Sequence, residues 1–154
     1  MLENLAVPDF EAPSTDGTTF RLHEMRGKPV VLYFYPKDDT PGCTMEAIDF
    51  SDLEDEFTHL HAVVLGVSRD DCLSHGSFRD KHGLCVRLLS DSEGEVCECY
   101  GVMHEKEVEG RKKVGILRST FIIDRRGILR HVLYGVKAMG HAAEVLNMVK
   151  GIKA

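Results

Sequence analysis

The chain has 154 residues, of which 43% are hydrophobic and 29% charged, and its formal net charge is −6. This length suits one domain, residues 1–154, that can bury a core without disulfide staples. The acidic balance argues against a nucleic-acid partner, whose phosphates need a basic surface, and no apolar run approaches the roughly 20 residues that a membrane span needs.

The first residues lack the basic stretch and the continuous apolar run that mark a secretory signal. We therefore expect a cytoplasmic protein. In that compartment, five cysteines indicate free thiols, redox chemistry or a metal site rather than a set of structural disulfides.

A hairpin and a buried strand are predicted for the first quarter of the chain. Short alternating stretches at 9–12 and 18–22 flank Asp16-Gly17, which is a hairpin signal. The stretch 30–35 has almost no polar position, as expected for a strand that is covered on both faces.

An amphipathic helix is expected to begin near Cys43 and to end near Phe57, after a charged loop. A cysteine at a helix start faces unpaired backbone N–H groups and the positive end of the helix dipole. Both favour a thiolate over a thiol, so a nucleophilic sulfur is expected at this position.

Strands and helices alternate in the next part of the chain. We expect a buried strand at 60–68, a helix at 72–82 closed by Gly83, a short strand at 88–91 and a helix near 93–100. Residues 102–114 predict either a loop or an exposed hairpin.

The chain then closes with strands at 119–124 and 128–134, joined by a tight turn, and a helix at 140–152. The apolar side of that helix is predicted to carry Ala143, Val145, Leu146, Val149 and Ile152. The whole pattern indicates one α/β domain with a central mixed sheet and helices on both faces.

The loop before Cys43 offers groups that suit a reactive sulfur. The Thr40 hydroxyl could accept from a substrate O–H and donate to the sulfur, and the Pro36 ring could shield a thiolate from water. The amides of Gly42 and Cys43 form a natural anion site.

A stable thiolate also sets two electrostatic conditions. Asp38 and Asp39 should be turned to solvent, and a fixed cation should lie nearby. Arg118, just before the apolar stretch 121–123, is the best candidate, because a partly buried guanidinium needs anions and acceptors. The Cys43 thiolate and Glu46, one helical turn later, would serve.

Three separated motifs resemble a known family. Residues 35–46, Tyr-Pro-Lys-Asp-Asp-Thr-Pro-Gly-Cys-Thr-Met-Glu, resemble the peroxiredoxin signature P-x-x-x-T-x-x-C, in its bacterioferritin-comigratory-protein or Q type. Residues 118–124, Arg-Ser-Thr-Phe-Ile-Ile-Asp, are similar to the second signature of that family, and residues 136–146 to its C-terminal helix entry. Residues 8–10 and 88–91 also fit, so the resemblance covers essentially the whole chain.

The resemblance implies a thioredoxin-like fold and a thiol peroxidase for hydrogen peroxide or small alkyl hydroperoxides. By position, Cys43 would be the peroxidatic cysteine, which becomes a sulfenic acid and needs a second thiol. Thr40 and Arg118 would bind the peroxide oxygens, Pro36 would shield the site, and Glu46 would hold Arg118. The resemblance implies no metal and no organic cofactor. It also implies a thioredoxin-type or small-thiol reductant and a monomer or weak homodimer.

The chain departs from the commonest pattern of this subgroup at the resolving cysteine. The fifth residue after Cys43 is Ile48, and the alternative position in the next helix aligns with Arg79. Two residues at i and i+5 of an intact helix are about 8–9 Å apart, beyond disulfide reach, so relatives that use that pair must unwind the helix. Ile48 removes this requirement.

Several thiols remain as resolving candidates. An external thiol acting on a one-cysteine enzyme is one reading, and Cys72 or Cys85 after a loop movement is another; Cys97 and Cys99 are further possibilities. The Cys97-Glu98-Cys99 stretch lacks the second knuckle that zinc needs, and the eight histidines show no metal spacing.

Two other functions stay open. A thiol–disulfide exchange protein on the same fold is weaker, because no Cys-x-x-Cys surrounds Cys43. A redox sensor is the non-enzymatic alternative. An exchange protein should ignore peroxide, and a sensor need not turn over with a reductant.

Overall fold

A central sheet of five strands organises the computed structural model, which describes residue 1 and residues 3–152. The strand order is β5 (Arg87–Ser90), β4 (Val63–Ser68), β3 (Val30–Phe34), β8 (Ser119–Ile123) and β9 (Leu129–Tyr134). Strands β3, β4 and β5 are parallel, whereas β8 is antiparallel to both β3 and β9. The predicted mixed sheet is therefore confirmed.

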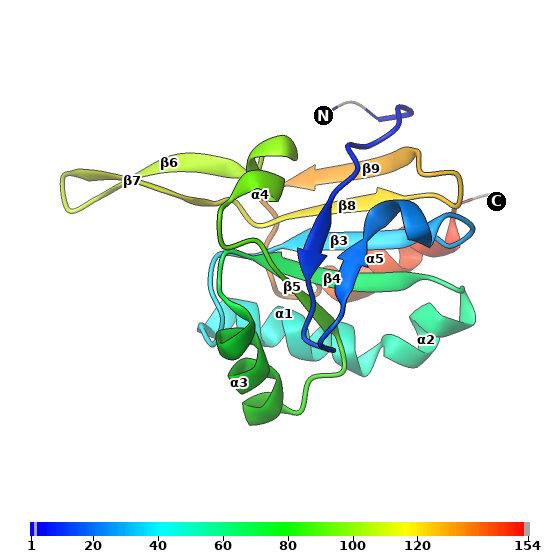
Figure 1. Ribbon diagram of the computed structural model, residues 1–154, viewed down its shortest axis with the longest axis horizontal. Coiled ribbons are helices and arrows are strands. Elements are labelled where there is room, and N and C mark those ends of the chain that lie inside the picture. The colour runs from blue at the N-terminus through cyan, green and yellow to red at the C-terminus, as the bar shows by residue number, and fades with distance from the viewer. Residues whose placement is uncertain (2, 153–154) are drawn as a thin grey trace.

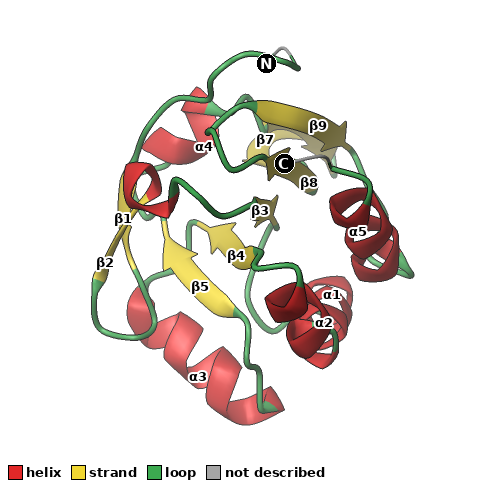
Figure 2. Ribbon diagram, turned by 90° about the vertical axis from the view of Figure 1, so that its right-hand side faces the viewer, coloured by secondary structure: helices red, strands yellow, loops and turns green. Residues whose placement is uncertain are grey.

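Helices and a hairpin cover the two faces of this sheet (Figure 2). One face packs against α1 (Pro41–Asp52), α2 (Glu54–His59), α3 (Cys72–His82) and α5 (His141–Lys150). The other packs against α4 (Glu95–Cys99), the 3-10 turn η1 (Leu22–Met25) and the hairpin of β1 (Glu11–Pro13) and β2 (Thr19–Arg21). Within the part of the chain that the structure describes, no helix has the length and apolar character needed to cross a membrane.

The central strand β3 explains why there are two cores. All five of its residues are buried, and successive side chains of a strand point to opposite faces. Accordingly Leu32 and Phe34 join the core under α4 and the hairpin, whereas Val31 and Tyr33 join the core under the other helices. The continuous apolar run in the sequence reflects this double burial.

Several predicted boundaries match the structure closely. Helix α3 has the predicted bounds because Asp71 accepts from the Ser74 amide at its start and Gly83 adopts a left-handed φ of 62° at its end. The segment after residue 102 forms an exposed hairpin of β6 (Met103–Val108) and β7 (Arg111–Ile116), which projects from the body (Figure 1).

Three predicted details are wrong. The helix expected to continue to Phe57 is divided into α1 and α2 at Leu53, whose ψ of 7° leaves the helical region. The strand expected from residue 60 begins only at Val63, after a turn in which His61 has a φ of 59°. On α5, Ala143 is exposed, and its neighbour Ala142 is the buried alanine.

Candidate active site

The pairing of β3 with β8 brings two segments that are distant in sequence to the same end of the sheet. The last residue of β3, Phe34, lies opposite Ser119, the first residue of β8. The loop after β3 leads into α1, and Arg118 directly precedes β8. Because the strands are antiparallel, the end of one and the beginning of the other meet, and Arg118 lies beside the start of α1.

Helix α1 begins as the sequence predicts. Thr40 occupies the N-cap position with extended backbone angles, and Pro41 follows as the first helical residue, where its missing N–H is harmless. The first helical hydrogen bond runs from the Thr44 amide to the Thr40 carbonyl, at 2.8 Å. The amides of Gly42 and Cys43 precede it and have no intrahelical acceptor, so they remain available for an anion.

Cys43, Arg118 and Glu46 form the centre of the site. The Cys43 side chain is buried, and its Sγ accepts a hydrogen bond from Arg118 Nη2 at 3.4 Å. Arg118 Nη1 donates to Glu46 Oε1 at 2.6 Å. Glu46 is fully buried, and its Oε2 has no hydrogen-bond partner among the described residues. The carboxylate therefore holds the guanidinium in a position that faces the sulfur.

Burial sets the protonation of this pair. It raises the pKa of Glu46 to about 7, against the opposing effect of the Arg118 charge. Burial alone would lower the pKa of Arg118, but Glu46 and Cys43 outweigh it and raise that pKa above its ordinary value. The guanidinium therefore stays charged, and Glu46 is the group whose charge changes near neutral pH.

Gly42 has a role that the sequence did not reveal. A Cβ atom at this position would lie 3.1 Å from Arg118 Nη2, closer than ordinary van der Waals contact. The missing side chain therefore makes room for the guanidinium beside Cys43, in addition to the exposed amide that the sequence predicted.

Thr40 and Pro36 lie in the loop that precedes α1. The Thr40 hydroxyl donates to the Lys37 carbonyl at 2.8 Å, so its proton points to the loop. The sequence had allowed donation to the sulfur instead, and the structure does not show it. Its oxygen lone pairs remain available as acceptors. Pro36 is exposed at the end of β3, and its shielding of the sulfur stays a prediction.

The expectation that both loop aspartates face solvent is wrong for one of them. Asp39 is exposed and pairs with Lys81 and His82 of α3. Asp38 is buried, and it accepts hydrogen bonds from Tyr35 Oη at 2.6 Å and Ser74 Oγ at 2.8 Å.

The partner that makes this burial possible is His75 of α3. Its Nδ1 lies 2.7 Å from Asp38 Oδ2, and both side chains are nearly inaccessible to solvent. Burial alone would raise the pKa of Asp38, but the hydrogen bonds from His75, Tyr35 and Ser74 lower it below its ordinary value. Sequence reasoning missed this pair, although His75 shares the buried side of its helix with Phe78.

Asp38, Asp70 and His75 are also the one group of possible metal ligands found in the described part of the chain. Their ligand atoms already serve each other, since Asp70 Oδ2 accepts from the Asp38 amide at 2.8 Å and from Ser68 Oγ at 2.7 Å. A hydrogen-bonded network therefore accounts for the cluster.

The remaining cysteines differ in accessibility. All five are free thiols. Cys72, Cys85 and Cys99 are exposed, whereas Cys97 is buried in the core on the opposite face of the sheet from Cys43. A hydrogen bond from the Cys85 thiol to Glu54 raises the pKa of that thiol, which disfavours its reactive form. Cys97 and Cys99 diverge on α4, as predicted.

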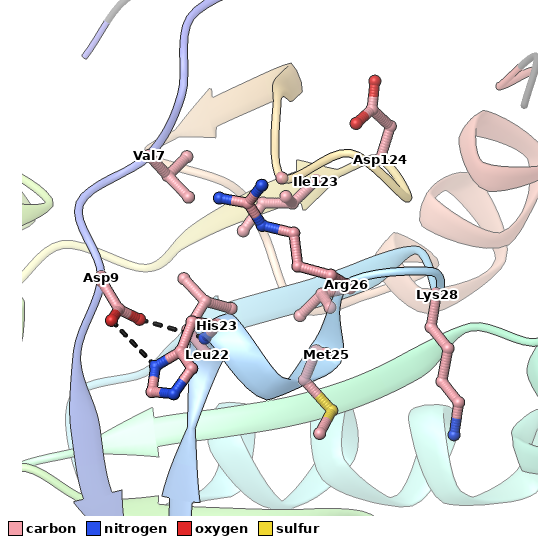
Figure 3. A pocket seen from close by; sticks show the side chains of 11 residues that line it. Val7, Asp9, Leu22, His23, Met25, Arg26, Lys28, Ile123 and Asp124 are labelled. Carbon is pink, nitrogen blue, oxygen red and sulfur yellow. Dashed lines mark hydrogen bonds and ion pairs between the residues drawn. The ribbon is translucent and has the colours of Figure 1, made fainter.

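A separate cavity of about 120 Å³ lies at the other end of the sheet (Figure 3). Its wall includes Val30 and Ile123, which pair at the ends of β3 and β8 remote from Arg118. His23 is held there by Asp9 at 3.0 Å, and Arg26 reaches across the opening. The cavity shares no lining residue with the Cys43 site.

Comparison with known proteins places the chain in a family. Residues 4–132 match the AhpC/TSA family. The chain is 48% identical to a putative peroxiredoxin bcp of Coxiella burnetii, over 92% of this chain and 93% of that protein. It is 46% identical to peroxiredoxin Bcp of Bacillus subtilis, with 94% and 92% covered.

Among solved structures, the bacterioferritin comigratory protein of Xanthomonas campestris superposes with a TM-score of 0.91 at 38% identity, covering 97% of this chain and 98% of that one. That structure belongs to work on its alkyl peroxide reduction activity through trapped intermediate and ligand complexes.

Proposed function

We propose, for a chain that belongs to the AhpC/TSA family and within it to the Bcp or Q-type peroxiredoxins, that Cys43 is the sulfur that attacks the peroxide. The chain is a thiol peroxidase with the thioredoxin-like fold of that family. The observation that carries the assignment is the 3.4 Å contact between Arg118 Nη2 and Cys43 Sγ at the start of α1. This contact supplies the cation that a reactive thiolate needs.

The reaction follows from this arrangement. The Cys43 thiolate attacks one peroxide oxygen, the O–O bond breaks, and the sulfur keeps that oxygen as a sulfenic acid. The other oxygen leaves with the bonding electrons and takes a proton to become water or an alcohol. Arg118 and the amides of Gly42 and Cys43 surround the position where this negative charge develops, which lowers the barrier.

Thr40 orients the peroxide in this scheme. Its own proton is engaged by the Lys37 carbonyl, so its oxygen acts as the acceptor for the O–H of the peroxide. An acceptor on one oxygen and a guanidinium nearby align the O–O bond with the sulfur. Glu46 holds Arg118, and Pro36 is assigned to shielding because it lies two residues after β3, in the loop that leads to Cys43.

The substrates are hydrogen peroxide and small alkyl hydroperoxides. The Xanthomonas campestris relative reduces alkyl peroxides, and its fold superposes on this one. We further assign the reductant to a thioredoxin-type protein or a small thiol, the protein to a monomer or weak homodimer, and the compartment to the cytoplasm. The five free thiols support the last assignment.

An external thiol and Cys72 are the two candidates for resolving the sulfenic acid. A nucleophile can reach Cys43 only if it approaches the loop before α1. Cys72 is exposed and lies between Asp70 and Ser74, which both bind Asp38 of that loop. Cys85 lacks such a link and has a raised pKa, and Cys97 lies behind the sheet.

The decisive experiment is peroxide consumption with a thiol reductant by wild type, Cys43→Ser and the matched control Cys99→Ser. We expect turnover in wild type and Cys99→Ser and none in Cys43→Ser. Retained turnover without Cys43 would contradict the proposal. Reduction of insulin disulfides without peroxide turnover would instead favour the exchange protein, and oxidation without turnover would favour the sensor.

A further inference from the structure

The loop between β3 and α1 is anchored mainly by α3 and the residues just before it. Asp38 binds Ser74 and His75, and Asp39 binds Lys81 and His82. Asp39 also adopts a left-handed φ of 58°, which aspartate tolerates better than most non-glycine residues. Contacts with α3 therefore help to fix the position of the loop.

Both ring nitrogens of His75 have a hydrogen-bond partner. Nε2 lies 2.9 Å from the Leu89 carbonyl, which can only accept, so Nε2 carries a proton. Nδ1 faces Asp38 Oδ2, and Asp38 already accepts from Tyr35 and Ser74. His75 thus links the loop to β5, with one ring nitrogen on Asp38 and the other on the Leu89 carbonyl.

One peptide group transmits this anchoring to Thr40. The amide of Asp38 donates to Asp70 Oδ2 at 2.8 Å, and the carbonyl of the same peptide, that of Lys37, accepts from Thr40 Oγ1 at 2.8 Å. A peptide is planar, so fixing its N–H and the Asp38 side chain also fixes its C=O. A carboxylate on the N–H polarises the peptide and strengthens the bond at its other end.

We propose that His75 is a positioning residue, which through Asp38 fixes the peptide that orients the Thr40 hydroxyl toward the peroxide. Asp70 holds the same peptide directly, by accepting a hydrogen bond from its N–H. The inference rests on the proposed function of Cys43 and Thr40. Without His75, the buried Asp38 carboxyl group loses a hydrogen-bond partner, so the loop must shift to reach water. A shift of about 1 Å in a reacting group can cost about 100-fold in rate.

Two substitutions of His75 separate its two bonds. The amide nitrogen of asparagine takes the place of Nδ1, so His75→Asn keeps a donor to Asp38. The amide nitrogen of glutamine takes the place of Nε2, so His75→Gln keeps the donor to the Leu89 carbonyl and loses the link to the loop. If the loop link matters, asparagine should rescue activity and glutamine should not.

Two rates should be measured on the reduced protein by quenched flow and mass spectrometry. The sequence contains no tryptophan, so tryptophan fluorescence cannot report oxidation. We expect His75→Gln to slow oxidation of Cys43 by hydrogen peroxide at least about tenfold and His75→Asn to stay within about threefold of wild type. Alkylation of Cys43 by iodoacetamide does not use Thr40, and it should stay within about threefold in both variants.

A Thr40→Val background tests whether His75 acts through Thr40. There, His75→Gln should slow oxidation by less than about twofold, because the group that it positions is already missing. His23→Gln is the matched control, since His23 binds Asp9 through Nδ1 on the surface at the other end of the sheet. It should leave both rates unchanged.

Three results would overturn the inference: equal oxidation rates in the two His75 variants, a parallel fall in alkylation, or additive effects of His75→Gln and Thr40→Val. Should His75→Gln fail to fold, Asp70→Ala takes its place, with the same expected tenfold loss and the same dependence on Thr40. If wild type itself does not consume peroxide, the proposed function fails. If wild type reacts and the variants match it, only the role of His75 fails.

Discussion

The Arg118 guanidinium reaches the Cys43 sulfur from 75 residues further along the chain and places Nη2 3.4 Å from Sγ. Glu46 holds the guanidinium in this position, because its fully buried carboxylate binds the other terminal nitrogen, Nη1. One cation therefore serves two anions, of which only the sulfur belongs to the reaction. This division of roles makes the contribution of each residue separable by experiment.

Replacing Arg118 should slow the peroxide step far more than it alters the fold. We expect Arg118→Ala to reduce the rate of Cys43 oxidation about 100- to 1000-fold, the usual effect of removing one donor from a developing oxyanion. The oxidation rate of Arg118→Lys should fall between those of wild type and Arg118→Ala, because a single ammonium cannot contact both Glu46 and Cys43 as the forked guanidinium does. Quenched-flow oxidation measures both; a rate for Arg118→Ala near that of wild type would exclude the role.

The same variant should be destabilised at alkaline pH, because it leaves the Glu46 carboxylate buried without its cation. Adding Glu46→Gln to Arg118→Ala removes that charge. The double variant should therefore regain stability against urea at pH 8 while its oxidation rate stays low. Recovery of both properties together would mean that Arg118 acts only on the fold.

Glu46 should give the protein a pH-dependent stability of predictable sign. Its pKa is raised from 4.5 to about 7 on folding, so the folded state binds this proton more tightly than the unfolded state. The contribution of Glu46 to stability is thus largest below pH 4.5 and is lost as the pH rises toward 7. Relative to Glu46→Gln, wild type should lose about 3 kcal/mol over this range, because each pKa unit corresponds to about 1.4 kcal/mol. Urea unfolding of both proteins between pH 4.5 and 8 measures the difference, and parallel curves would contradict it.

Gly42→Ala should reduce activity without reducing stability. Alanine in a helix is favoured over glycine by about 0.5–1 kcal/mol, so the variant should unfold no more easily than wild type. Its Cβ would lie 3.1 Å from Arg118 Nη2 and push the guanidinium away from the sulfur, so oxidation should slow several-fold. Gly76→Ala of α3 is the control, since a Cβ there meets no described atom within 4 Å. It should gain stability without losing rate.

One equivalent of peroxide should identify the resolving thiol. Peptide mapping with intact mass distinguishes a Cys43 sulfenic acid, which an external thiol must reduce, from an internal disulfide. If an internal disulfide forms, we expect its partner to be Cys72, and Cys72→Ser should then leave Cys43 at the sulfenic stage or beyond. A disulfide to Cys97 would contradict the structure, because that thiol lies on the other face of the sheet.

Much of the fold was predictable from local signals. The bounds of α3 follow from a capping aspartate and a terminal glycine, and the burial of β3 follows from its continuous apolar run. The peroxiredoxin assignment and the thioredoxin-like fold are confirmed by the family match and the superposed relative. The contact between Arg118 and Cys43 was expected because a partly buried guanidinium before an apolar strand needs an anion, and the structure contains this contact. That residues 1–154 form one domain stays a prediction.

The errors arise where tertiary contacts decide. Asp38 and Asp39 are adjacent and chemically alike, and it is Asp38 that is buried, where it meets Tyr35, Ser74 and His75. No glycine or proline near Leu53 indicates in the sequence that the first long helix is divided there. A histidine on the buried side of α3 was the available signal, because a buried imidazole needs a polar partner.

The pairing of Phe34 with Ser119 has a consequence for how this enzyme fails. Cys43 lies in the helix that follows β3, and Arg118 directly precedes β8, so the contact between them depends on the alignment of these two strands. A slip of one residue would turn every side chain of β8 to the opposite face. Substitutions in the apolar core should therefore lower the rate of peroxide reduction before they change the size or shape of the molecule measurably. The rate of peroxide reduction therefore reports on the alignment of β3 and β8.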